Sequence, residues 1–118
     1  MNLSSLAHET GKINFDDINN KKDYKMWPVY MQSKLANVYF TKHFAKLLQD
    51  GKVENVKVCS LHPGVVRTEL GRYMFGNKIV EAVFRIVTAP FFYLMTKNPW
   101  EGTQTSLHCC LMPFSQIE

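Results

Sequence analysis

Apolar residues recur at helical spacing between residues 28 and 49. The positions that share this spacing are Met31, Leu35, Val38, Phe40 and Phe44. Spacings of three and four residues place such side chains on one broad face of an α-helix. Pro28 suits the first turn of this helix, and Gly51 is expected to occupy the C′ position that ends it.

A short apolar run at 56–61 predicts a buried strand, which His62-Pro63-Gly64 ends because proline cannot donate to a strand ladder. Residues 1–5 are typical of the end of an earlier strand that opens into a loop. A long helix between two strands predicts a crossover connection in a parallel α/β sheet.

The connection at 6–28 is polar, and we expect Ile13, Phe15 and Ile18 to hold it against a core. Residues 78–88 predict a short amphipathic helix that breaks near Pro90. A further helix should run to residue 112. Its start is marked by Asn98 as N-cap, proline at N1 and Glu101 at N3, the sequence of a capping box.

Composition narrows the class of protein. The chain has 118 residues, of which 46% are apolar, and this fraction is typical of a packed domain rather than a disordered segment. Its net charge of +4 comes from scattered residues, so we expect no nucleic-acid partner. Three cysteines and four histidines show no metal-ligand spacing, which predicts a reducing compartment and no metal site. The apolar run at 79–95 contains Glu81, Arg85 and Pro90 and is too short to predict a membrane span.

Tyr30 and Lys34 form the candidate chemical site, because four residues separate them and a helix places both side chains on one face. A phenol titrates near 10 when unperturbed, and an ammonium group held beside a phenol favours the phenolate. The pair is therefore a plausible proton-transfer unit. An exposed helix can also carry this spacing by chance, so the pair alone does not define a site.

Four blocks in order extend the pattern beyond this pair. They are Leu3-Ser4-Ser5-Leu6-Ala7-His8, Tyr30-x-x-Ser33-Lys34-Leu35-Ala36-Asn37, Ser60-x-His62-Pro63-Gly64-x-Val66-Arg67-Thr68-Glu69-Leu70 and Gly102-Thr103-Gln104-Thr105-Ser106-Leu107-His108-Cys109. Together these blocks resemble the C-terminal half of a short-chain dehydrogenase/reductase of the retinol dehydrogenase-like branch. The resemblance runs over nearly the whole chain and is weakest at 72–97.

The resemblance implies roles for three catalytic residues. Ser5 would hydrogen-bond the substrate oxygen, although the neighbouring Ser4 could be confused with it. Tyr30 would be the general acid/base, and Lys34 would favour the ionised phenol and hold the nicotinamide ribose.

The resemblance also implies a cofactor site, for NADP or NAD, that includes Tyr30 and Lys34. The other residues it assigns to cofactor binding are Pro63, Gly64, Val66 and Thr68.

Two family features have no counterpart in this sequence. One is the strand with a glycine-rich turn that cradles the pyrophosphate, since no two of the six glycines are spaced as G-x-G. The other is the asparagine that completes the catalytic group. We therefore expect residues 1–118 to form a single partial domain. It would be a partial Rossmann-like doubly wound parallel sheet that lacks the N-terminal dinucleotide-binding half and the last strand.

The implied function is an NAD(P)-dependent oxidoreductase that interconverts a lipophilic alcohol and its carbonyl. These 118 residues by themselves are expected to be inactive. The alternative is a non-catalytic fragment or degenerate paralogue that acts, if at all, through dimerisation. Expected partners are a small lipophilic substrate, a second copy of the chain and a peripheral membrane surface. The expected location is intracellular, either cytoplasmic or on an intracellular membrane.

Overall fold

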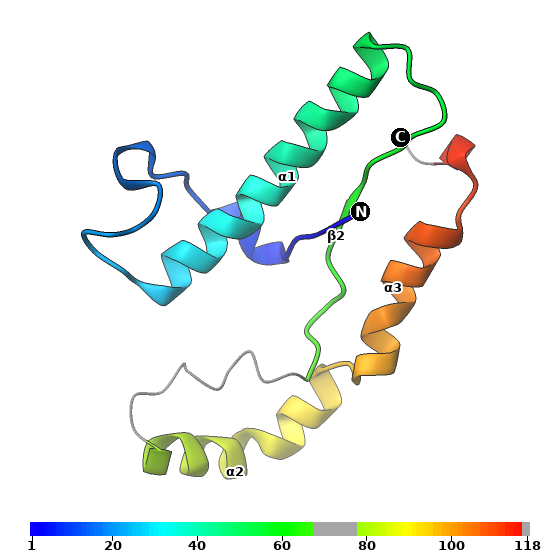
Figure 1. Ribbon diagram of the computed structural model, residues 1–118. Helices are drawn as coiled ribbons and strands as arrows, with labels where there is room; N and C mark the ends of the chain where they lie inside the picture. Colours follow the sequence, from blue (N-terminus) through cyan, green and yellow to red (C-terminus); the bar gives the residue numbers. More distant parts are fainter. Residues whose placement is uncertain (68–77, 117–118) are drawn as a thin grey trace.

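The computed structural model describes residues 1–67 and 78–116. In these ranges two short parallel strands are flanked by one long helix, α1 (Met26–Asp50), while α2 (Lys78–Met95) and α3 (Pro99–Leu111) follow the second strand. Figure 1 shows α1 and α3 on opposite sides of the strands and α2 beyond them. The result is a mixed α/β arrangement with a small parallel sheet.

The sheet consists of β1 (Asn2–Leu3) and β2 (Ser60–Leu61), paired in parallel with Asn2 opposite Ser60. Backbone hydrogen bonds run from the Asn2 amide to the Cys59 carbonyl at 2.8 Å and from the Ser4 amide to the Leu61 carbonyl at 2.7 Å. The prediction of a strand end at the start of the chain and of a parallel crossover is confirmed. The second strand is shorter than predicted, because only the residues opposite β1 have a ladder partner in the described part of the chain.

Helix α1 covers the predicted span and extends it by a residue or two at each end. Its C-terminus is a Schellman motif in which the Val53 amide donates to the Leu48 carbonyl and the Lys52 amide to the Gln49 carbonyl. The left-handed residue is Lys52, with φ of 52°, whereas Gly51 has φ of −79°. The prediction that Gly51 occupies C′ was therefore wrong by one position.

Helix α2 does not break near Pro90 but continues to Met95, so that prediction was wrong. Proline fixes φ close to the helical value and removes one backbone donor, which a helix tolerates at the cost of a bend. Figure 1 shows α2 changing direction along its length. None of the helices in the described ranges combines the length and the apolar character that a membrane crossing requires.

Helix α3 begins as predicted. The Asn98 side chain accepts from the Glu101 amide at 2.8 Å, and the Glu101 carboxylate accepts from the Asn98 amide at 2.7 Å. Both halves of the capping box are present, so the predicted start is confirmed, and the helix ends one residue before the predicted position.

The connection at 6–25 contains two short 3₁₀ helices, η1 (Leu6–Thr10) and η2 (Phe15–Asp17). Phe15 is 81% exposed and Ile18 is also exposed, so the prediction that they hold the loop against a core was wrong. The buried Gln32 of α1 holds it instead, accepting from the Asn14 amide and donating to the Ile18 carbonyl, each at 3.0 Å. Hydrogen bonds through Gln32 therefore fasten this loop, and Ile13, the third residue of that prediction, is half-buried.

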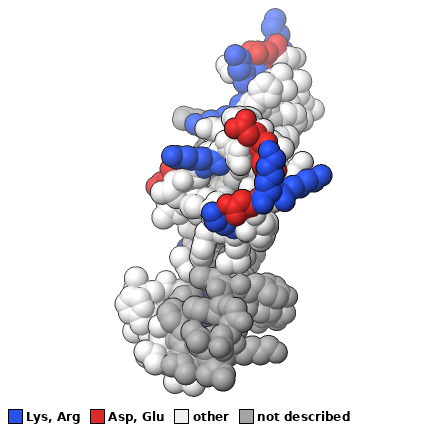
Figure 2. Space-filling view, turned by 90° about the vertical axis from the view of Figure 1, so that its left-hand side faces the viewer, with Lys and Arg blue, Asp and Glu red and all other residues white. Residues whose placement is uncertain are grey.

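Apolar burial is sparse. Among the described residues Leu61 is the one hydrophobic side chain in the buried class, while many large ones are exposed, up to Leu94 at 82%. The radius of gyration is 17.6 Å, against about 13–14 Å for a compact domain of this length. Figure 2 shows basic and acidic side chains interleaved over the loop and α1, with no single basic patch on that face. The helices thus present apolar faces that this chain alone does not cover.

We expect the separate 118-residue chain to unfold over a broad temperature range and to bind a hydrophobic dye in the native buffer. Ordering each residue costs roughly 1–2 kcal/mol, and the apolar area buried here is too small to offset that cost with a margin. Circular dichroism and dye fluorescence during heating would test this expectation. A sharp cooperative transition without dye binding would contradict it.

Candidate active site

Helix α1 is attached to the end of β1 by polar contacts. The Leu3 carbonyl accepts from Lys34 Nζ at 3.2 Å and from Asn37 Nδ2 at 2.9 Å. In return the buried Ser4 donates from Oγ to the Lys34 carbonyl at 2.9 Å. These contacts place the N-terminal half of α1 against the carboxyl end of the strand.

A second polar contact fixes the direction of the helix. Asn2 Nδ2 donates to Thr41 Oγ1 at 2.9 Å, and the buried Thr41 hydroxyl donates to the Asn37 carbonyl at 2.8 Å. Because Asn37 and Thr41 lie one turn apart, α1 is held to β1 over two successive turns.

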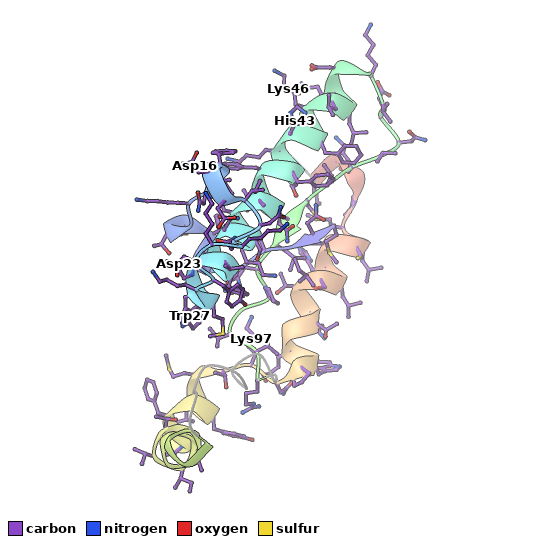
Figure 3. The ribbon with its side chains drawn as sticks, turned by 60° about the vertical axis from the view of Figure 1, so that its left-hand side comes forward. Asp16, Asp23, Trp27, His43, Lys46 and Lys97 are labelled. Atoms are coloured by element: carbon purple, nitrogen blue, oxygen red, sulfur yellow. The ribbon has the colours of Figure 1, made fainter. Side chains whose placement is uncertain are left out.

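Tyr30 and Lys34 share one face of α1, one turn apart. Lys34 Nζ lies 5.5 Å from the centroid of the Tyr30 ring. Trp27 also contacts that ring edge-to-face, with centroids 6.0 Å apart and planes at 85°. Figure 3 shows Trp27 at the N-terminal end of α1. The ammonium group is therefore held between the Leu3 carbonyl and the phenol ring.

The structure distinguishes the two neighbouring serines. Ser4 is buried and bound to the backbone of α1, so its hydroxyl serves the packing of helix on strand. Ser5 is the N-cap of η1 and its Oγ accepts from the Ala7 amide at 3.3 Å. A hydroxyl that accepts one bond keeps its own proton to donate. Ser5 rather than Ser4 therefore has a hydroxyl that can serve a substrate oxygen.

The segment after β2 carries the predicted cofactor residues. Gly64 has φ of +93°, a conformation that favours glycine, and turns the chain directly after Pro63. Val66 forms a parallel bridge with Lys97, in which the Arg67 amide donates to the Lys97 carbonyl at 2.9 Å. Thr68, the last of the predicted residues, lies outside the described ranges.

The parallel pairing brings these segments to one edge. Ser5 follows β1 and Gly64 follows β2, and both strands end at the same side of the sheet. Lys34 is bound at that side through Leu3. In open α/β sheets this carboxyl edge is where nucleotide ligands bind. The polar side chains at this edge include Lys34 and Ser5.

A contact within the chain also accounts for the glycine at position 64. A Cβ at that position would lie 3.1 Å from the side chain of Lys97, so the lysine stem already passes over the glycine. Figure 3 shows Lys97 in the short segment between α2 and α3. The contact with the Lys97 side chain explains the absence of a side chain at Gly64 as well as a bound ligand would. Lys34 therefore supports a cofactor site more strongly than Gly64 does.

Sequence reasoning missed several residues that position the site. Asn37 lies one turn beyond Lys34, so its spacing could have identified it. Gln32 and Lys97 carry no sequence signal that separates them from exposed polar residues. Their roles depend on contacts with residues distant in the chain.

Comparison with known proteins adds independent information. The chain is 44% identical over 111 residues to retinol dehydrogenase 12 of Bos taurus, which covers 94% of this chain and 32% of that protein. It is 41% identical over 111 residues to human retinol dehydrogenase 14, covering 94% of this chain and 31% of that protein. No family model matches the chain.

A crystal structure of an uncharacterised protein from Mycobacterium paratuberculosis is similar in fold. It has a TM-score of 0.51 and 37% identity and covers 59% of this chain and 26% of that chain. The chain thus spans about a third of the length of the curated relatives it matches. Over nearly all of its own length it is homologous to the retinol dehydrogenases, and it belongs with them to the short-chain dehydrogenase/reductase family.

Proposed function

We propose that this chain forms the catalytic segment of an NAD(P)-dependent oxidoreductase that interconverts a lipophilic alcohol and its carbonyl. The observation that carries the proposal is the Lys34 ammonium, held between the Leu3 carbonyl and the Tyr30 ring at the carboxyl edge of a parallel sheet. The relatives that match over 94% of the chain are named as retinol dehydrogenases, which supports a retinoid-like substrate. The two strands would belong to a Rossmann-like doubly wound sheet.

The chemistry divides among three side chains. A nicotinamide cofactor, when bound, supplies or accepts the hydride. The Tyr30 hydroxyl exchanges a proton with the substrate oxygen as the carbon changes oxidation state. Ser5 donates a hydrogen bond to the same oxygen and fixes its position. Lys34 stabilises negative charge that develops on the phenol.

The cofactor would be held at its nicotinamide end. Lys34 would bind the ribose hydroxyls, with Tyr30 beside it. Pro63 and Gly64 would bend the chain under the ring, and the Val66 backbone and Thr68 hydroxyl would bind the carboxamide. NADP is the preferred form and NAD the alternative. No glycine pair here is spaced to cradle a pyrophosphate, so these residues would hold only part of the dinucleotide.

A non-catalytic role through dimerisation is the second candidate. It is favoured by the exposed aromatic side chains of α1, where Phe40 and Phe44 stack with centroids 5.7 Å apart and Tyr39 is also exposed. An apolar stripe of this kind on a helix suits a partner helix. In this case the segment would retain its fold contacts without supporting turnover.

A chimera separates the two candidates. The 111 matched residues of bovine retinol dehydrogenase 12 would be replaced by the corresponding residues of this chain. The catalytic proposal expects the chimera to oxidise retinol with NADP, while the separate 118-residue chain binds no NADPH. A folded chimera that binds NADPH but does not turn over would contradict a catalytic role and favour the second candidate.

Tyr30→Phe in this chimera should lower kcat by about 10²–10⁴-fold, because the ring remains but the proton donor is lost. NADPH affinity should change little. The matched control is Tyr39→Phe, an exposed position on the same helix. Near-normal turnover of Tyr30→Phe would remove this residue from the mechanism.

Lys34→Met should weaken NADPH binding by about tenfold or more, because a charged hydrogen bond contributes roughly 1.5–3 kcal/mol. The methionine keeps the length and the apolar stem of the side chain. Lys42→Met, an exposed lysine on the same helix, is the control. Calorimetric titration of both variants provides the measurement, and equal affinities would show that Lys34 holds only the backbone of β1.

A further inference from the structure

The C-terminal end of α2 meets the segment that follows β2. Figure 1 shows these two parts of the chain and the start of α3 coming together. Val66 and Lys97 form the parallel bridge, in which the Lys97 amide donates to the Val65 carbonyl at 2.8 Å and the Arg67 amide to the Lys97 carbonyl at 2.9 Å. Both bonds are made by the backbone, so neither depends on a side chain.

The Arg67 side chain makes a second attachment, to the last turn of α2. Its guanidinium carbon lies 4.2 Å from the centroid of the Tyr93 ring, and its Nη1 donates to the Tyr93 carbonyl at 3.3 Å. A guanidinium group can stack on an aromatic ring while its N–H groups bond to acceptors nearby. Arg67 therefore contacts both the ring and the backbone of one residue.

The position of Tyr93 in α2 explains why this bond matters. Tyr93 is within the last turn of the helix, which ends at Met95. The last four carbonyls of a helix have no partner inside the helix, and a positive charge near them is favourable. Arg67 supplies both the donor and the charge from another part of the chain. The last turn of α2 is thus stabilised by the segment that follows β2.

This last turn presents apolar side chains at the edge of the proposed reaction. Phe91, Leu94 and Met95 are all exposed. The segment that holds the turn also contains Gly64 and Val66, which are predicted to lie beside the nicotinamide. A lipophilic alcohol bound at this edge would gain affinity by burying its carbon chain against apolar side chains.

We propose that Arg67 is a positioning residue that fixes the last turn of α2 through Tyr93 and so sets how tightly a lipophilic alcohol binds. The role in alcohol binding rests on the proposed function, whereas the attachment of α2 does not. Substitution of the Arg67 side chain leaves the backbone bridge in place, so the nicotinamide segment keeps its position. The substitution therefore weakens binding of the alcohol and spares binding of the cofactor.

The first test measures the attachment without reference to activity. Amide hydrogen exchange in the last turn of α2 is followed by mass spectrometry in the chimera and its variants. Arg67→Met should speed this exchange about fivefold or more, because both contacts with Tyr93 are lost. Tyr93→Leu loses only the stacking and should have a smaller effect. The double variant should match Arg67→Met, since the two changes remove the same interaction.

Tyr93→Phe is the matched control for the ring. Neither contact uses the phenol hydroxyl, so this variant should exchange at the rate of the unsubstituted chimera. Unchanged exchange in Arg67→Met, or additive effects in the double variant, would overturn the proposal.

The second test separates alcohol binding from the other steps of turnover. Arg67→Met should raise KM for retinol about fivefold, with kcat and NADPH affinity within about twofold of the unsubstituted values. Tyr93→Phe should retain the original KM. Faster exchange with an unchanged KM, or an equal loss of NADPH affinity, would overturn the proposal. If the chimera binds NADPH without turnover, the proposed function fails, and the affinity for retinol, measured by quenching of protein fluorescence, replaces KM.

Discussion

The contact between α1 and the last carbonyl of β1 is the constraint on which the rest of this structure depends. Two donors from successive turns, Lys34 and Asn37, converge on the Leu3 carbonyl, and Ser4 returns a bond to the helix backbone. A carbonyl at the end of a strand needs partners once the ladder stops. Here the partners come from the helix that carries Tyr30. The same interactions that end the strand therefore position the proposed catalytic pair.

Because the same contacts end the strand and position the proposed pair, the Lys34 ammonium group has two neighbours. Its ammonium satisfies a backbone carbonyl and also lies near the Tyr30 ring. An ammonium group has three donors, so one bond to Leu3 leaves two for a ribose. A lysine that only held β1 would not require a phenol beside it. A lysine that only served catalysis would not require the hydrogen bond to β1. The arrangement accounts for both, and it places the proposed chemistry at the sheet edge where nucleotides bind.

Features that depend on residues close in the sequence could be predicted from the sequence. Features that depend on contacts between residues distant in the chain could not. The capping box at Asn98 and Glu101 was predictable because both its bonds are formed within one turn. Gln32 was not, since its importance lies in bonds to a loop many residues earlier. Gly51 was assigned the left-handed position that Lys52 occupies, because glycine is only the preferred residue there. Of the candidate site, the placement of Tyr30 and Lys34 followed from helical spacing, whereas the Lys97 stem over Gly64 could not be inferred.

The small number of buried apolar side chains is consistent with the partial coverage of the relatives by this chain. The chain corresponds to about a third of its curated relatives, and its helices expose apolar faces that a larger sheet or a partner would cover. The proposed cofactor contacts likewise serve only the nicotinamide end. Catalysis in this account requires surfaces and phosphate-binding elements beyond the described residues.

The most direct test of the central claim is a crystal structure of the chimera with bound NADPH. We predict Lys34 Nζ at about 3 Å from a ribose hydroxyl, with the bond to the Leu3 carbonyl retained. We also predict that the Tyr30 hydroxyl faces the reactive edge of the nicotinamide. A nicotinamide ribose bound away from Lys34, with Tyr30 turned to solvent, would contradict it.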